Sequence, residues 1–243
     1  MKLGIIGFGR LGKLITRYLA QDFTVYVYDK INCDREITQL GAIPASFKDI
    51  CELPAIIPVV PISKFENVVK KISKYVKPGT LVIDVCSVKE FPVKAMKKLL
   101  PKKVSILGTH PMFGPDSAAD TLYGTKIVLC DVRMEDTQFE KIKLYLQRHG
   151  IKTIECSPKE HDKDISHSLL LTHFIGRSLM GVGAHELKID TKGYRRLMKI
   201  LQTVENDSWE LFEDMNKYNK YAKKTRQEFI KSIDRIDKKV KKL

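Results

Sequence analysis

Apolar and polar residues alternate over the first two thirds of the chain in a pattern that predicts short buried strands separated by amphipathic helices. An apolar run at 2–6 is followed by a helical pattern to about residue 20 and by a β-branched and aromatic run at 23–28. Strands are also expected at 55–60, 81–85, 104–107, 126–130 and 152–155, and helices at 47–53, 64–75, 93–100 and 137–148. Such alternation predicts an α/β fold with a doubly wound, mostly parallel sheet. Pro58 does not suit a central strand, because proline has no N–H to donate to the ladder.

From His161 onward the pattern is helical throughout, which predicts an all-helical second domain. We therefore expect domains at 1–156 and 157–243. A second helix is expected at 194–218 and a last one from residue 221. The last helix carries an apolar stripe at steps of four and three, made of Phe229, Ile233, Ile236, Val240 and Leu243. This stripe predicts packing onto the body or onto a partner subunit, and we expect a homodimer.

The composition of the 243 residues is that of a globular protein, with 43% hydrophobic and 30% charged residues. No apolar run approaches the roughly 18–20 residues of a membrane span, and the start of the chain lacks a signal-peptide pattern, so we expect a cytoplasmic protein that binds no membrane. The net charge of +14 raises nucleic acid as a partner, but residues 221–243 alone hold nine Lys or Arg against three acids. A solvated helix face explains this tail without nucleic acid.

The five cysteines are scattered and have no C-x-x-C spacing; they are Cys33, Cys51, Cys86, Cys130 and Cys156. An odd, dispersed set argues against a disulfide framework and against a zinc site. We expect reduced thiols and no bound metal.

Residues 7–12, Gly-Phe-Gly-Arg-Leu-Gly, lie between the first strand and the first helix and match the G-x-G-x-x-G pattern of Rossmann-type domains. The first glycine permits a tight turn, the second lets the backbone approach a pyrophosphate, and the third lets the helix lie close to the sheet. Asp29 ends the second strand and is expected to bind the ribose, which favours NAD; Lys30 follows it and leaves NADP as the alternative. The candidate cofactor-binding residues are Gly7, Phe8, Gly9, Arg10, Leu11, Gly12, Asp29, Pro61 and Ser87.

Two further motifs follow expected strands: Asp-Val-Cys-Ser-Val-Lys at 84–89 and Gly-Thr-His-Pro-Met-Phe-Gly-Pro-Asp at 108–116. Ligands of a doubly wound sheet bind at the carboxyl ends of its strands, so both motifs and the glycine loop are expected to line one crevice. Glycine and proline fix the backbone of the second motif, which we expect to form a rigid loop that holds His110 in place. Ser87 and His110 are therefore candidate catalytic residues beside a bound nicotinamide.

These two motifs, together with Glu-His-Asp-Lys-Asp-Ile-Ser-His-Ser-Leu-Leu-Leu-Thr-His-Phe-Ile-Gly-Arg at 160–177, resemble the prephenate and arogenate dehydrogenase family, especially its plant-type arogenate members. The segment 193–219 extends the likeness. The resemblance implies a dinucleotide-binding domain followed by a helical domain that forms a homodimer. It also implies NAD(P)-dependent oxidative decarboxylation of arogenate or prephenate, a reaction of tyrosine biosynthesis.

The resemblance assigns roles to individual residues. His110 would accept the proton of the ring hydroxyl, and Ser87 would hydrogen-bond the same hydroxyl or the histidine. His173 would orient the substrate, while His161 and His167 are expected to cap a helix or face solvent.

Recognition of the substrate's charged groups is expected from other residues. Lys199 takes the position of an arginine that reaches the substrate in bacterial members, and Arg195 and Arg196 precede it by one turn. Asp116 either pairs with the ammonium of arogenate or caps the segment that follows it.

Two other functions remain compatible with the glycine loop. One is a reductase of the imine or β-hydroxyacid type, which does not need the set of Ser87, His110 and His173. The other is a dinucleotide-sensing protein that binds cofactor without turnover. Turnover of arogenate or prephenate distinguishes both from a dehydrogenase of this family.

Overall fold

The computed structural model describes residues 1–242 and divides into two compact units, Met1–His161 and Asp162–Leu243. Leu243, the last residue of the expected apolar stripe, lies outside the described residues. The units meet within helix α7 (Pro158–His167), whereas the sequence pattern placed the boundary after residue 156, where the last strand ends.

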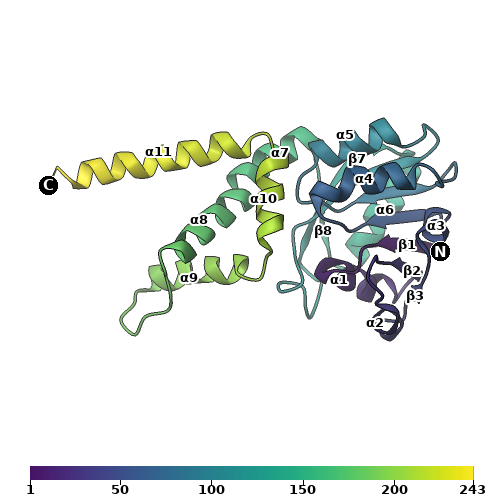
Figure 1. The fold of residues 1–243 in the computed structure, drawn as a ribbon, viewed down its shortest axis with the longest axis horizontal. Coiled ribbons are helices and arrows are strands. Elements are labelled where there is room, and N and C mark those ends of the chain that lie inside the picture. Colours follow the sequence, from purple (N-terminus) through teal and green to yellow (C-terminus); the bar gives the residue numbers. More distant parts are fainter. Residues whose placement is uncertain (243) are drawn as a thin grey trace. The chain divides into compact units, whose positions relative to one another are not determined.

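The first unit contains one 8-stranded sheet with the strand order β3-β2-β1-β4-β5-β6-β7-β8 (Figure 1). Pairing is parallel from β3 to β6, β7 is antiparallel to β6, and β8 is parallel to β7. The mostly parallel, doubly wound sheet expected from the sequence is therefore confirmed. The strands are β1 (Lys2–Ile6), β2 (Thr24–Tyr28), β3 (Ile43–Pro44), β4 (Ala55–Pro58), β5 (Leu81–Asp84), β6 (Ser105–Pro111), β7 (Lys126–Arg133) and β8 (Lys152–Glu155).

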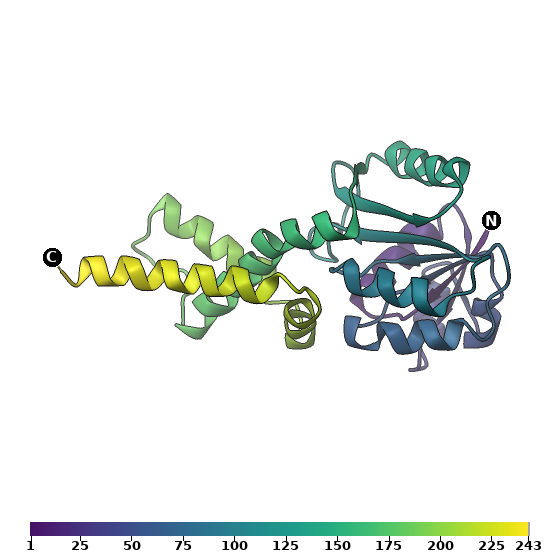
Figure 2. The same cartoon turned by 90° about the horizontal axis from the view of Figure 1, so that it is seen from above.

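Helices cover both faces of the sheet, and Figure 2 shows α4 and α5 on one face and α6 on the other. The central strands are apolar along almost their whole length because neither of their faces meets water: every residue of β4 is buried, as is β6 from Ile106 to Pro111. The helices of this unit are α1 (Arg10–Leu19), α2 (Asp34–Gln39), α3 (Phe47–Cys51), α4 (Ile62–Ile72), α5 (Glu90–Leu99) and α6 (Asp136–Arg148).

Pro58 is compatible with the sheet because of its position. It is the last residue of β4 and pairs with Ile6 of β1, but β4 pairs with β5 only through Ala55 and Ile56. The missing N–H of Pro58 therefore falls beyond the ladder between β4 and β5.

The second unit is built from α8 (Leu169–Gly181), α9 (Lys192–Val204), α10 (Trp209–Tyr218) and α11 (Ala222–Val240). The single helix expected over 194–218 is wrong, because Ser208 begins a new helix: its hydroxyl accepts a hydrogen bond from the Leu211 N–H at 3.1 Å. Helices α8 and α9 approach closely at Gly176, where an added Cβ would lie 2.6 Å from Cγ2 of Val204. The hydrophobic pattern also did not predict α2 and β3, because these elements are too short to show a helical or strand periodicity in the sequence.

Helix α11 presents apolar side chains to solvent in the isolated chain. Ile230, Ile233, Ile236 and Val240 are each at least half exposed. In both views the C-terminal half of this helix extends beyond α8, α9 and α10 (Figure 1, Figure 2). Among residues 1–242, no helix combines the length and the apolar character that crossing a membrane requires.

Candidate active site

The glycine loop between β1 and α1 has the backbone geometry that its sequence predicts. Gly7 has a φ of 108°, and its N–H donates to the Tyr28 carbonyl at 2.8 Å. A side chain at Gly7 would overlap the carbonyl oxygen of Val59, and one at Gly12 would overlap that of Gly7. Both positions therefore require glycine.

Gly9 differs from the other two glycines because the space beside it is open. Among the described residues, and apart from its own chain neighbours, no heavy atom lies within 4 Å of the position that a Cβ would take. Gly9 is also the N-cap of α1 and makes no side-chain capping bond, and the N-terminus of a helix favours an anion. An open approach at a helix N-terminus fits the pyrophosphate of a dinucleotide.

Asp29 holds the glycine loop to the end of β2. Its Oδ2 accepts a hydrogen bond from the Phe8 N–H at 2.7 Å, and its Oδ1 accepts one from the Ile31 N–H at 2.9 Å. Sequence reasoning assigned Asp29 only to a ribose and missed this internal contact. A carboxylate has about four acceptor positions, so hydroxyl donors of a ribose are still compatible with this arrangement.

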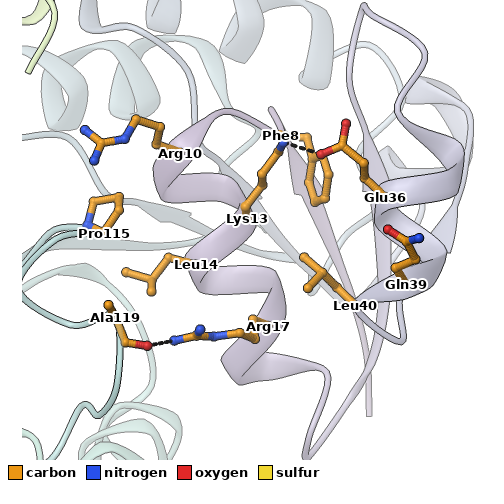
Figure 3. A pocket seen from close by; sticks show the side chains of 10 residues that line it. All are labelled: Phe8, Arg10, Lys13, Leu14, Arg17, Glu36, Gln39, Leu40, Pro115 and Ala119. Atoms are coloured by element: carbon orange, nitrogen blue, oxygen red, sulfur yellow. Dashed lines mark hydrogen bonds and ion pairs between the residues drawn. The ribbon is translucent and has the colours of Figure 1, made fainter. Parts of the chain in front are cut away.

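A cavity of about 330 Å³ lies beside the glycine loop, along the cationic face of α1 (Figure 3). Lys13 pairs with Glu36, which raises the pKa of Lys13, and Arg17 donates to the carbonyl of Ala119. The residues that line the cavity are Phe8, Arg10, Lys13, Leu14, Arg17, Glu36, Gln39, Leu40, Pro115 and Ala119. The cavity thus adjoins the candidate cofactor site and includes neither Ser87 nor His110.

Asp116 is paired with a residue of the glycine loop. Its Oδ1 lies 2.5 Å from a guanidinium nitrogen of Arg10, and about half of each side chain is exposed. The turn around it is held by Ser117, whose hydroxyl accepts from the Gly114 N–H at 3.0 Å. Asp116 therefore links the 112–121 segment to the start of α1 in this structure.

Pro61, the last of the expected cofactor residues, follows β4. It is exposed and forms the N-cap of α4, where its carbonyl accepts from the Lys64 N–H at 2.9 Å. Pro61 and the glycine loop therefore both follow strands whose carboxyl ends share one edge of the sheet.

A fully buried ion pair anchors the segment that carries Ser87. The ammonium of Lys89 pairs with Oδ2 of Asp84, Oδ1 of Asp84 accepts from the Cys86 N–H at 2.7 Å, and Thr109 donates to the Asp84 carbonyl at 2.7 Å. Burial raises the pKa of Asp84, and Lys89 opposes that change. Ser87 is half-buried and lies between Asp84 and Lys89 in the sequence, just after the end of β5. Sequence reasoning missed this pair, although opposite charges in an otherwise apolar strand end were visible in the motif.

His110 belongs to a strand and not to a loop, so that part of the expectation is wrong. Strand β6 continues to Pro111 because β7 pairs with it antiparallel, with His110 opposite Val128. The loop with the second Gly-Pro pair begins only after Pro111. The side chain of His110 is 5% exposed, and burial lowers its pKa well below the ordinary value, with further lowering by the nearby charges of His161 and Lys89. His110 is therefore neutral near pH 7, as a general base must be.

The expectation that His161 caps a helix or faces solvent is wrong. His161 is 3% exposed, and its Nε2 lies 2.9 Å from Nδ1 of His110. A capping box positions it: the Ser157 hydroxyl accepts from the Glu160 N–H at 3.2 Å, and the Glu160 carboxylate accepts from the Ser157 N–H at 2.9 Å. His167, on the same helix, is exposed as expected.

In the second unit, His173 is 3% exposed on α8, and its Nε2 lies 3.5 Å from Oδ2 of Asp207. Burial lowers the pKa of His173; Asp207 opposes this change and Arg177 adds to it. Arg177, one turn along α8, donates to the Asp207 carbonyl and stacks over the Trp209 ring at 5.3 Å. Sequence reasoning assigned no role to Arg177 or Asp207, although the spacing of four between His173 and Arg177 was a usable signal.

The three cations expected to bind the substrate carboxylate lie on the exposed side of α9. Arg195, Arg196 and Lys199 are all exposed, and the buried side of the helix holds Met198 and Leu201. Arg195 faces Asp190, with 3.5 Å between its Nε and Oδ1 of the acid.

Potential metal ligands do not gather in the described part of the chain. There, no group of three His, Cys, Asp or Glu side chains has the arrangement of a metal site. The cysteines described are all free thiols.

Comparisons with known proteins agree with this fold. A family model described as "Prephenate dehydrogenase, nucleotide-binding domain" matches residues 14–155, and one described as "TYRAAT1-like, C-terminal domain" matches residues 178–243. The chain is 33% identical to arogenate dehydrogenase 1, chloroplastic, of Arabidopsis thaliana, over 94% of this chain and 37% of the relative. It is 32% identical to arogenate dehydrogenase 2, chloroplastic, of the same plant, over 98% of this chain and 67% of the relative.

The crystal structure of prephenate dehydrogenase from Aquifex aeolicus in complex with hydroxyphenyl propionate and NAD+ has the same fold. Its TM-score is 0.79 at 21% identity, with 100% of this chain and 91% of that chain covered. The present chain thus corresponds to nearly all of that structure but to little more than a third of the first plant relative.

Proposed function

Since the chain belongs to the prephenate dehydrogenase family, we propose that it catalyses the oxidative decarboxylation of arogenate or prephenate with NAD or NADP as oxidant. The resemblance first seen in the motifs at 84–89, 108–116 and 160–177 is confirmed by these matches. The observation that carries the proposal is the buried, neutral His110 at the carboxyl end of β6, hydrogen-bonded to His161.

The residues of the first unit fit a bound dinucleotide. The open space at Gly9 and the N-terminus of α1 suit the pyrophosphate, and Asp29 suits the ribose. When bound, the cofactor supplies a hydride acceptor. The carboxylate of Asp29 repels a 2′-phosphate, so NAD is the preferred form of the cofactor.

In the proposed reaction His110 accepts the proton of the ring hydroxyl while a hydride leaves the carbon that carries it. The bond between the ring and its carboxylate then breaks, carbon dioxide departs, and the electron pair of that bond remains in the ring, which becomes aromatic. General-base assistance of this type contributes about 10²–10⁴ in rate. Ser87, which follows the neighbouring strand β5, is proposed to hydrogen-bond the hydroxyl or His110.

Positioning of the base depends on His161. A single hydrogen bond joins the two rings, so only one of the facing nitrogens carries a proton. When His110 donates from Nδ1, its Nε2 keeps the lone pair that accepts the substrate proton. We propose that His161 accepts this hydrogen bond and so favours the reactive tautomer of His110. His173 is proposed to orient the substrate.

Steady-state kinetics with arogenate and with prephenate, each with NAD and with NADP, test the proposal. We expect oxidation of at least one ring substrate, with tyrosine formed from arogenate or hydroxyphenylpyruvate from prephenate. Cofactor binding without turnover of either substrate would support the dinucleotide-sensing alternative instead. Turnover of imine or β-hydroxyacid substrates alone would support the reductase.

The assembly and location of the protein are part of the proposal. The exposed apolar residues of α11 support a homodimer, because a stripe of this kind is normally covered. A cytoplasmic location stays a prediction from the sequence, and the two plant relatives carry the word chloroplastic in their names.

A further inference from the structure

Cys130 and Cys156 stand opposite each other across strands β7 and β8. The last pair in the ladder between these strands is Leu129 with Glu155. The Cys156 N–H donates to the Leu129 carbonyl at 3.2 Å, which is the bond of a parallel ladder in which Cys156 faces Cys130. Adjacent strands lie about 4.7–4.9 Å apart, within the range of about 4.4–6.8 Å between the Cα atoms of a disulfide. The backbone thus places the two cysteines where a disulfide can form.

The two thiols touch but differ in their surroundings. Both are free thiols in the structure. Burial raises the pKa of Cys130 to about 12, and the Cys156 thiol, which hydrogen-bonds it, adds to this increase. Cys130 is fully buried, whereas Cys156 is half-buried and lines a cavity of about 520 Å³. A small molecule therefore reaches Cys156 first.

The cavity beside Cys156 favours an uncharged reactant. Four carboxylates line it, and the ammonium of Lys143 pairs with two of them. An acidic lining disfavours anions such as glutathione disulfide, whereas hydrogen peroxide is small and uncharged. Peroxide is therefore the class of oxidant that suits this thiol. The carboxylates belong to Asp131, Asp136, Glu140 and Glu155.

Closing a bond between the two sulfurs moves the start of α7. Cys130 is fixed in the sheet, because it pairs with Gly108 of β6, where an added Cβ would lie 3.3 Å from the Cβ of Cys130. Cys156 lies between the end of β8 and the capping box that begins α7. A disulfide holds its sulfurs about 2.05 Å apart, closer than two hydrogen-bonded thiols. The bond therefore draws Cys156, and with it the first turn of α7, toward β7.

We propose that Cys130 and Cys156 form a reversible disulfide that lowers the activity of the enzyme by displacing His161 from His110. The contact that is lost is the 2.9 Å hydrogen bond between the two rings. The effect on turnover rests on the function proposed above, whereas the disulfide itself rests on the pairing of β7 with β8.

The oxidation balances with hydrogen peroxide as the oxidant. The Cys156 sulfur attacks one oxygen of the peroxide, the O–O bond breaks, and the sulfur becomes a sulfenic acid while the other oxygen leaves with the thiol proton as water. The Cys130 sulfur then attacks the Cys156 sulfur, the S–O bond breaks, and hydroxide leaves with the Cys130 proton as a second water. A dithiol such as dithiothreitol reverses the bond by thiol–disulfide exchange and is itself oxidised.

Peptide mapping of the full chain by mass spectrometry tests the bond. The protein is treated with hydrogen peroxide, the remaining thiols are alkylated in denaturant, and the digest is searched for cross-linked peptides. We expect a cross-link between Cys130 and Cys156 that dithiothreitol removes. In the same samples kcat should fall by about 10-fold or more, as expected for loss of the His161 contact, and should recover with dithiothreitol.

Three variants assign the effect to this pair. Cys156→Ser should keep its kcat after peroxide treatment. Cys33→Ser is the matched control, because it removes another half-buried thiol of the first unit, and it should lose activity as the wild type does. Cys130→Ala removes the second thiol, so a sulfenic acid should persist on Cys156 and be trapped by the reagent dimedone.

Several results would overturn the proposal. These are the absence of a cross-link, a cross-link from Cys130 to Cys86 instead, an equal loss of kcat in Cys156→Ser, and an unchanged kcat in the cross-linked wild type. If the reduced protein turns over neither arogenate nor prephenate, the proposed function fails. The peptide map still decides in that case whether Cys130 and Cys156 form the disulfide.

Discussion

The Nδ1 atom of His110 lies 2.9 Å from the Nε2 atom of His161, a residue 51 positions later in the chain. The two rings are inclined by 69°, and both side chains are buried. One ring is carried by a strand and the other by the first turn of α7, so the sheet and a capped helix together fix the geometry of the candidate base.

Replacement of His110 by asparagine is expected to lower kcat by about 10² or more, because no proton acceptor remains at this position. Affinity for NAD should stay close to that of the wild type, since His110 does not belong to the glycine loop. Stopped-flow or steady-state kinetics and a separate cofactor titration measure the two quantities. Turnover equal to that of the wild type would remove His110 from the mechanism.

His161→Leu should lower kcat by about 10-fold, because leucine has no atom that accepts a hydrogen bond from Nδ1 of His110. It should also shift the pH profile. His161 contributes to the low pKa of His110, so its removal raises that pKa, and the acidic limb of kcat/KM moves to higher pH. The matched control is His167→Leu, at an exposed histidine of the same helix, which should leave the profile unchanged. An unshifted acidic limb in His161→Leu would mean that the contact is only structural.

Protein stability should fall on acidification, and His110 should account for part of the loss. The unfolded chain takes up a proton on this residue near its ordinary pKa of 6.5, whereas the folded protein does so only at lower pH. The contribution of His110 to the free energy of unfolding is therefore complete above pH 6.5. It is lost as the pH falls from there toward the pKa of His110 in the folded protein, with a slope of about 1.4 kcal/mol per pH unit for one proton. Urea unfolding between pH 7.5 and pH 5 should show a shallower dependence in His110→Asn than in the wild type. An equal pH dependence of the free energy of unfolding in the variant and in the wild type would contradict the low pKa of His110 in the folded protein.

Asp29→Asn should shift cofactor preference toward NADP. The asparagine oxygen can still accept from the Phe8 N–H, so the glycine loop is retained, while the charge that repels a 2′-phosphate is lost. We expect the kcat/KM ratio of NADP to NAD to rise by about 10-fold, from a wild-type value below one. A wild type that prefers NADP would show that Lys30 or another cation outweighs the carboxylate.

Asp116→Asn tests whether Asp116 discriminates between substrates. Arogenate carries an ammonium where prephenate carries a ketone, so a carboxylate that faces this group favours arogenate. We expect the arogenate-to-prephenate ratio of kcat/KM to fall by about 10-fold in the variant. If the pair with Arg10 is the sole role of Asp116, the KM of the cofactor changes and the substrate ratio does not.

Local features of the site were predictable from the sequence because each depends on a short stretch of chain. The positive φ at Gly7 and the close packing at Gly12 follow from a strand, a turn and a helix within about twenty residues. Apolar runs in the sequence predict the buried strands. The order in which strands and helices alternate then restricts the chain to few sheet topologies. The motifs around Ser87 and His110 could likewise be assigned to the carboxyl ends of neighbouring strands.

The contacts that tune the chemistry were decided only by the tertiary structure. The pairing of β7 with β6 turned the expected loop at His110 into strand, and the packing of α7 brought His161 against it. In the second unit, the fold joined Arg177 of α8 to Asp207, thirty positions away. Such contacts form between segments that are distant in the chain, and no local period or turn signal encodes them. Their geometry exists only once the sheet and the helices have packed, because burial excludes water and makes an unpaired polar atom costly.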